Sequence, residues 1–128
     1  MDGNQKVLVM DDDEMILTLV TSILELHDFL VETATDGQVA IEKYQRAMAE
    51  GQPFDLVIMD LTIPTGMGGK EALIEILKID PAAKCVVSSG HSSDPIMTKF
   101  SDYGFKGVIT KPFMVAELVG ALKDIIDN

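Results

Sequence analysis

The chain of 128 residues is 47% hydrophobic and carries a formal net charge of −11, so residues 1–128 are expected to fold as a single acidic domain. Its one cysteine excludes disulfides within the chain and fits a reducing cytoplasm, and no apolar run approaches the roughly 18 residues of a membrane span. The absence of a basic cluster argues against nucleic-acid binding and favours a cation or a basic protein face as partner.

Five short apolar runs rich in β-branched residues are expected to form strands. They cover residues 6–10, 30–34, 54–59, 84–88 and 107–110. Their nearly continuous apolar character is typical of strands buried on both faces of a parallel sheet.

Helical periodicity occupies the segments between these runs. Two apolar stripes mark the first two helices: Ile16, Leu19, Val20, Ile23 and Leu26 or His27, then Gly37, Ala40, Ile41, Tyr44, Ala47 and Met48. The third helix covers about 69–79 and ends before Pro81. The fourth is expected to begin with Asp94 as N-cap and to end near Gly104, and the last to cover about 114–126.

Strand and helix alternate five times, which predicts an α/β fold with a parallel sheet and helices on both faces. Ligands of such sheets bind beyond the carboxyl ends of the strands. The residues at those ends are Asp11, Asp12, Asp13 and Glu14 after the first run, Asp60 after the third, Ser88, Ser89 and Gly90 after the fourth, and Lys111 and Pro112 after the fifth.

Three of these carboxylates, on Asp11, Asp12 and Asp60, should converge and repel one another unless a cation is bound. Mg²⁺ is the natural cation because it prefers oxygen ligands and retains several waters. A carboxylate beside Mg²⁺ can attack phosphorus, which would make Asp60 a nucleophile. The alternative for residues 11–14 is an acidic helix start that complements the helix dipole, which is the preferred explanation for Asp13 and Glu14, whereas metal binding is preferred for Asp11 and Asp12. Turn capping is the alternative for Asp60.

Lys111 and Ser89 are candidates to bind the phosphoryl oxygens. Lys111 is the only basic residue at these strand ends and could reach an anion on Asp60. Ser89 offers a hydroxyl donor. The alternatives are a solvated surface charge for Lys111 and a turn cap for Ser89.

These residues together resemble a response-regulator receiver domain of the CheY-like class over essentially the whole chain. The matching motifs are VLVMDD at 7–12 and DLVIMD at 55–60. The spacing between Ser89 and the sequence Lys111-Pro112-Phe113 also matches the family. The resemblance implies a three-layer flavodoxin-like (βα)5 fold, doubly wound, with strand order 2-1-3-4-5. It also implies that Asp12, Asp60 and the Thr62 carbonyl bind Mg²⁺, with Asp11 acting mainly through water.

The resemblance further implies a function in a two-component phosphorelay. Asp60 would accept a phosphoryl group from a histidine kinase or a histidine phosphotransfer protein, with Ser89 and Lys111 assisting. The modified domain would then switch a surface that contacts a downstream protein, whose identity the sequence does not give. Such a domain is not a conventional enzyme, although it catalyses its own phosphorylation and dephosphorylation. The segment 60–71 is one residue longer than the commoner spacing and resembles receivers at the C-terminus of hybrid histidine kinases.

Two positions depart from the family pattern. Val108 stands where most receivers have an aromatic residue that reports phosphorylation, and Ser89 replaces the more frequent threonine, with His91 two residues later. Val108 is the best support for an alternative function, a receiver that binds partners without phosphorylation. A small Mg²⁺-dependent phosphohydrolase is disfavoured because Thr62 occupies the place of its acid/base aspartate.

Overall fold

The computed structural model describes residues 5–64, 66–90, 94–111 and 115–127. Its centre is a five-stranded parallel sheet with the order β2-β1-β3-β4-β5. The strands are β1 (Lys6–Met10), β2 (Leu30–Ala34), β3 (Leu56–Asp60), β4 (Cys85–Ser89) and β5 (Gly107–Thr110). This order confirms the predicted flavodoxin-like fold.

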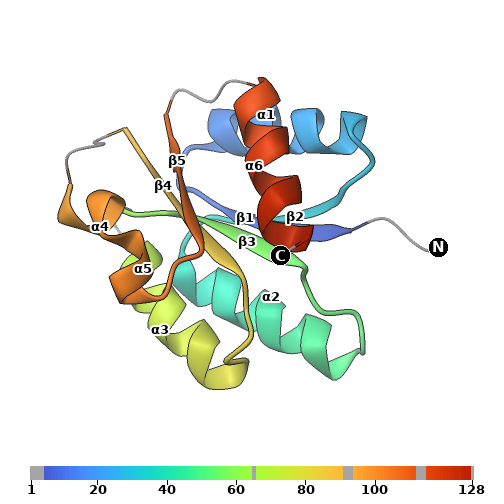
Figure 1. Cartoon of the computed structure of the whole chain (residues 1–128). Coiled ribbons are helices and arrows are strands. Elements are labelled where there is room, and N and C mark those ends of the chain that lie inside the picture. Colours follow the sequence, from blue (N-terminus) through green and yellow to red (C-terminus); the bar gives the residue numbers. More distant parts are fainter. Residues whose placement is uncertain (1–4, 65, 91–93, 112–114, 128) are drawn as a thin grey trace.

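The helices cover both faces of the sheet (Figure 1). On one face lie α1 (Glu14–Leu26) and α6 (Val115–Asp127), and on the other lie α2 (Gly37–Ala49) and α3 (Gly69–Ile79). Two short helices, α4 (Pro95–Thr98) and α5 (Phe100–Tyr103), connect β4 to β5. The result is three layers in which the carboxyl ends of the strands point toward one edge.

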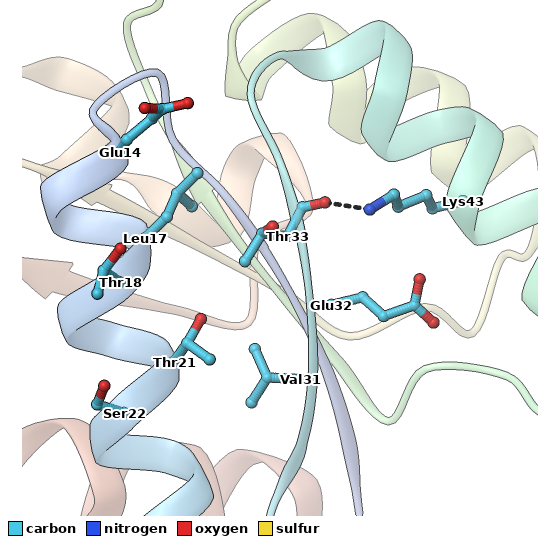
Figure 2. A pocket seen from close by; sticks show the side chains of 9 residues that line it. All are labelled: Glu14, Leu17, Thr18, Thr21, Ser22, Val31, Glu32, Thr33 and Lys43. Atoms are coloured by element: carbon cyan, nitrogen blue, oxygen red, sulfur yellow. Dashed lines mark hydrogen bonds between the residues drawn. The ribbon is translucent and has the colours of Figure 1, made fainter.

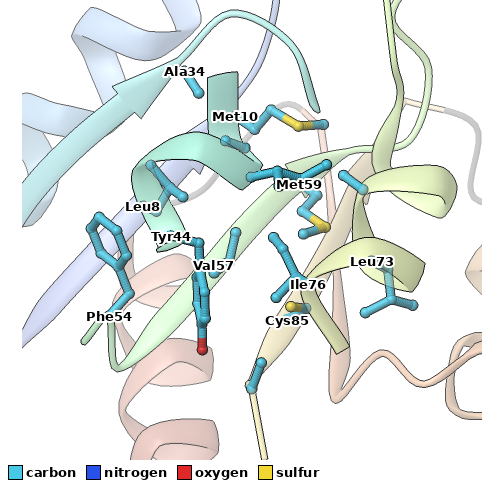
Figure 3. Close-up of a cluster of buried hydrophobic side chains, with 14 of the residues drawn as sticks. Leu8, Met10, Ala34, Tyr44, Phe54, Val57, Met59, Leu73, Ile76 and Cys85 are labelled. Carbon is cyan, nitrogen blue, oxygen red and sulfur yellow. The ribbon is translucent and has the colours of Figure 1, made fainter. Parts of the chain in front are cut away.

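Two hydrophobic clusters fill the space between the layers, because successive side chains of a strand point to opposite faces. Leu8, Met10, Val57 and Met59 pack under α2 and α3 in the first cluster, which Figure 3 shows with Tyr44 and Ile76. Val7, Val9, Leu56 and Ile58 pack under α1 and α6 in the second. The central strands β1 and β3 are therefore buried on both faces, as the apolar runs predicted.

The prediction of full burial is wrong for the edge strands. β2 starts with an exposed Leu30 and reaches full burial only at Ala34, and β5 ends with an exposed Thr110. Each has a neighbour on one side only, so part of its surface remains open to water. The predicted bounds also shift for β3 and β4, which extend to Asp60 and Ser89 because these residues pair with Ser88 and Thr110.

The apolar stripe predicted for the first helix is also partly wrong. The buried residues of α1 are Leu17, Val20, Ile23 and Leu24, whereas Leu19 and Leu26 of the predicted stripe are exposed. Apolar residues occupy both sides of this helix, so periodicity alone could not decide which side faces the sheet.

The fourth predicted helix is divided into α4 and α5. Its ends are as expected, since Asp94 accepts a hydrogen bond from the Ile96 backbone N–H and Gly104 adopts a left-handed conformation (φ 105°). Lys99 interrupts it with a non-helical backbone (φ −123°, ψ 40°). Within the described part of the chain, no helix is long and apolar enough to span a membrane.

Candidate functional site

Three strand ends bring charged side chains together at the carboxyl edge of the sheet. Asp11 and Asp12 follow β1, Asp60 ends β3 and Lys111 follows β5. One carboxylate oxygen from each of the three aspartates lies within 4.8 Å of the others. The Lys111 Nζ is 2.7 Å from Asp11 Oδ2 and 3.5 Å from Asp60 Oδ2. The structure thus assembles one cluster from residues up to 100 positions apart.

The start of α1 fixes Asp11. The Asp11 backbone N–H donates to the Ala34 carbonyl at 3.0 Å, and its Oδ1 accepts from the Asp13 backbone N–H at 2.9 Å. Asp13 is the N-cap of α1 and accepts from the Met15 N–H, which confirms that it belongs to an acidic helix start. Asp11 is buried and Asp12 is exposed, so one carboxylate lines the floor of the cluster and the other lies at its entrance.

The loop after β3 fixes Asp60. Its Oδ1 accepts a long hydrogen bond (3.4 Å) from the Thr62 backbone N–H. A Cβ atom on Gly69 would lie 2.9 Å from the Asp60 carbonyl oxygen, and one on Gly68 would lie 2.6 Å from the Leu61 carbonyl oxygen. Only glycine permits the start of α3 to approach these carbonyls so closely.

The electrostatics of the cluster are unbalanced. Burial and the neighbouring charge of Asp11 raise the pKa of Asp60 to about 6, although Lys111 and the Thr62 N–H oppose the rise. Burial by itself would lower the pKa of Lys111, but its hydrogen bond to Asp11 and the charges of both aspartates raise it. Three carboxylates facing one ammonium group leave negative charge in excess, which is the condition that favours a bound cation.

Ser89 lies next to this cluster. It is the last residue of β4, one position beyond the Ser88 that pairs with Asp60, and it is buried. Its carbonyl accepts from the Lys111 backbone N–H at 3.0 Å, which ties the ends of β4 and β5 together. The predicted residues Asp11, Asp12, Asp60, Ser89 and Lys111 are therefore gathered at one edge, with Thr62 in the adjoining loop.

Sequence reasoning missed two features of this arrangement. It expected Lys111 to reach Asp60, which the 3.5 Å contact confirms, but it did not expect Asp11 as the closer partner. It also did not identify Gly68 and Gly69 as residues that shape the loop, although two consecutive glycines after a strand were a usable signal. His91 and Pro112 lie outside the described residues. Val108 is half-buried and packs against the first hydrophobic cluster.

A groove of about 580 Å³ lies between α1 and β2, apart from the aspartate cluster. Figure 2 shows that hydroxyls of α1 and β2 line it and that Lys43 donates to the Thr33 carbonyl at one side. None of the three clustered aspartates, Ser89 or Lys111 lines this groove. The residues predicted to bind the metal and the phosphoryl group therefore lie at the carboxyl edge of the sheet and not in this groove.

Comparison with known proteins agrees with this geometry. The family model of the response regulator receiver domain matches residues 7–123. The chain is 35% identical over 122 residues to the chemotaxis protein CheY of Thermotoga maritima, covering 94% of this chain and 97% of that protein.

Solved structures agree as well. CheY4 of Vibrio cholerae has a TM-score of 0.86 at 27% identity, with 96% of this chain and 99% of that chain covered. The CheX–CheY–BeF3–Mg²⁺ complex of Borrelia burgdorferi has a TM-score of 0.85 at 26% identity, with 94% and 88% covered. The chain belongs to the response-regulator receiver family and is a CheY-like, phospho-accepting domain of two-component signalling.

Proposed function

We propose that Asp60 is the phospho-acceptor of this receiver and that Lys111 and Ser89 bind the transferred group. The observation that carries the proposal is the position of the Lys111 Nζ, 2.7 Å from Asp11 and 3.5 Å from Asp60. An ammonium group that lies between two buried carboxylates can change its ion-pair partner when one of them gains negative charge. Lys111 would therefore move from Asp11 toward a phosphoryl oxygen on Asp60.

The aspartate cluster fits Mg²⁺. Hard divalent cations take carboxylate and carbonyl oxygens, and the cluster offers Asp11, Asp12 and Asp60 within 4.8 Å of one another. We assign Asp12, Asp60 and the Thr62 carbonyl as protein ligands, with Asp11 acting through water. The ion would neutralise charge on the phosphoryl oxygens and on the attacking carboxylate. The raised pKa of Asp60, which burial and Asp11 cause, supports the assignment because it marks a carboxylate that lacks a sufficient counter-charge.

The chain's own residues would complete the transfer. An oxygen of the Asp60 carboxylate forms a bond to phosphorus while the P–N bond of a phosphohistidine breaks, and the electron pair stays on the imidazole nitrogen. The Lys111 ammonium and the Ser89 hydroxyl stabilise the phosphoryl oxygens through hydrogen bonds. The domain thus catalyses its own modification and does not turn over an external substrate.

The outer face of α1 is a suitable surface for the phosphodonor. This face, consisting of Met15, Leu19 and Leu26, is exposed at 82%, 49% and 81%. It begins three residues after Asp12, at the entrance of the cluster. We infer that a histidine kinase or histidine phosphotransfer protein packs an apolar helix against it. A donor bound to this face would hold its phosphohistidine near Asp60. We also propose a cytoplasmic location, where the thiol of the buried Cys85 remains reduced.

Intact mass spectrometry after incubation with acetyl phosphate and Mg²⁺ tests the acceptor. Wild-type protein should gain one phosphoryl group that is labile to base, and Asp60→Asn should gain none. An adduct that persists in Asp60→Asn would place the acceptor elsewhere. A folded wild-type protein that gains no adduct would favour the phosphorylation-independent binding module.

Leu19→Asn tests the donor surface separately. Transfer from a phosphorylated histidine phosphotransfer protein should slow, whereas the reaction with acetyl phosphate should keep its wild-type rate because the small donor needs no docking surface. Met48→Asn, at an exposed apolar position on α2, is the matched control. Equal transfer rates for all three proteins would exclude α1 as the docking surface.

A further inference from the structure

The loop between Asp60 and α3, described at residues 61–64 and 66–68, carries Thr62, and its far side lies against the start of α2. The Gly37 backbone N–H donates to the Met67 carbonyl at 2.8 Å. Gly66 approaches the N-cap of α2, since a Cβ on Gly66 would lie 3.0 Å from the Asp36 Cβ. The loop is therefore attached to a helix that contributes no residue to the aspartate cluster.

Met67 lies directly across Gly37. A Cβ atom added to Gly37 would be 2.7 Å from the Met67 Cγ and 2.9 Å from its Cβ. The Met67 Cβ cannot move without its backbone, so a larger residue at position 37 would displace the Met67 main chain and its hydrogen bond. This contact requires glycine at position 37 for steric reasons, because φ there is not positive.

Close contacts also fix the inner side of the same loop, which faces the sheet. Ile63 is buried in the first hydrophobic cluster, and Gly68 and Gly69 pack against the carbonyls of Leu61 and Asp60. Thr62 lies between Leu61 and Ile63, the two residues that these inner contacts hold. The contact between Gly37 and Met67 holds the other end of the same loop, so the course of the backbone through Thr62 depends on an inner and an outer anchor.

We propose that Gly37 and Met67 are positioning residues for the metal site and act through this loop. The inference rests on the proposed role of the Thr62 carbonyl and adds a determinant of Mg²⁺ affinity outside the cluster. Mg²⁺ demands nearly ideal octahedral geometry, so a ligand on a loosened loop must be ordered when the ion binds.

Calorimetric titration with Mg²⁺ alone tests the proposal. Gly37→Ala should weaken Mg²⁺ binding about tenfold, the lower range of effects for residues that orient metal ligands. Gly120→Ala is the matched control, since a Cβ on Gly120 meets nothing within 4 Å. The control should keep the wild-type Kd.

A second substitution keeps the test decisive if Gly37→Ala does not fold. Met67→Ala retains the main-chain hydrogen bond but loses the side-chain packing, so it should weaken binding about threefold, and Met67→Leu should restore it. A wild-type Kd in Met67→Ala, or in Gly37→Ala with a lowered Tm, would show that the contact serves stability alone. If wild-type protein itself binds no Mg²⁺, the proposed metal site fails and this inference fails with it.

Discussion

Two polar groups of this molecule can be compared, the aspartate cluster at the carboxyl edge of the sheet and a tyrosine–aspartate pair between α2 and the end of α3. In the pair, the Tyr44 hydroxyl donates to Asp80 Oδ2 at 2.7 Å, and Asp80 Oδ1 accepts from the Ala82 backbone N–H at 3.0 Å. Burial, together with the hydrogen bond and charge of Asp80, raises the pKa of Tyr44. Both oxygens of this carboxylate have donors.

The cluster differs because its charges are not balanced. Among the described residues, Lys111 is the single ammonium group that contacts Asp11 and Asp60, and Asp12 adds a third carboxylate nearby. A pair with complete hydrogen bonding stabilises the fold, whereas excess charge costs stability and is retained for binding. The following predictions test this contrast in order of decreasing effect.

Removal of the Lys111 ammonium group should have the largest effect on the unfolding free energy. Lys111→Ala leaves the Asp11 carboxylate buried without its closest partner, so the Mg²⁺-free protein should lose about 2–4 kcal/mol of unfolding free energy. Urea denaturation measures the change, with the exposed Lys123→Ala as control. If both variants were equally stable, the ion pair with Asp11 would contribute nothing. Mg²⁺-dependent phosphorylation of the folded Lys111→Ala protein should also become slower.

The tyrosine–aspartate pair should affect stability without affecting phosphorylation. Tyr44→Phe removes one hydrogen bond to a carboxylate and should lower the unfolding free energy by about 1–2 kcal/mol. The rate of phosphorylation by acetyl phosphate should stay at the wild-type value. A slower rate in a folded Tyr44→Phe protein would mean that the pair and the cluster are coupled.

Neutralising the phospho-acceptor should stabilise the protein. Asp60→Asn removes a carboxylate that burial and Asp11 disfavour, so the Mg²⁺-free protein at neutral pH should gain on the order of 1 kcal/mol. The exposed Asp124→Asn is the control, and urea denaturation is the measurement. A loss of stability would show that the hydrogen bond from Thr62 outweighs the repulsion.

The same carboxylate should produce a small pH effect. Its pKa is about 6 in the folded protein, raised from 3.8, so folded Asp60 binds a proton more readily than unfolded Asp60. The protonated Asp60 carboxyl therefore contributes to the unfolding free energy fully below about pH 4, and this contribution is lost as pH rises through about 6. The stability of wild type relative to Asp60→Asn should fall over this interval without Mg²⁺ and should fall less with Mg²⁺. A pH-independent difference between the two proteins would contradict the raised pKa.

Much of the aspartate cluster could be predicted from the sequence, whereas the hydrogen bond between Tyr44 and Asp80 could not. The runs before Asp11 and Asp60 are short, apolar and rich in β-branched residues, which predicts buried strands, and the position of each aspartate directly after its run placed it at the carboxyl edge. Local chemistry also determined the capping roles of Asp13 and Asp94. The family resemblance of 7–12 and 55–60 supplied the strand order that periodicity does not contain.

Tertiary structure decided the remaining features, because they depend on contacts between distant segments. The apolar residues of α1 lie on two sides, and only packing against the sheet, chiefly β1 and β2, determined that Leu17 and Val20 face inward while Leu19 faces outward. Lys111 could equally have paired with Asp60, which ends the strand nearer to β5, yet in the folded protein its ammonium group lies closer to Asp11. The sequence by itself thus determined which residues reach the edge of the sheet, and three-dimensional packing determined which of them touch.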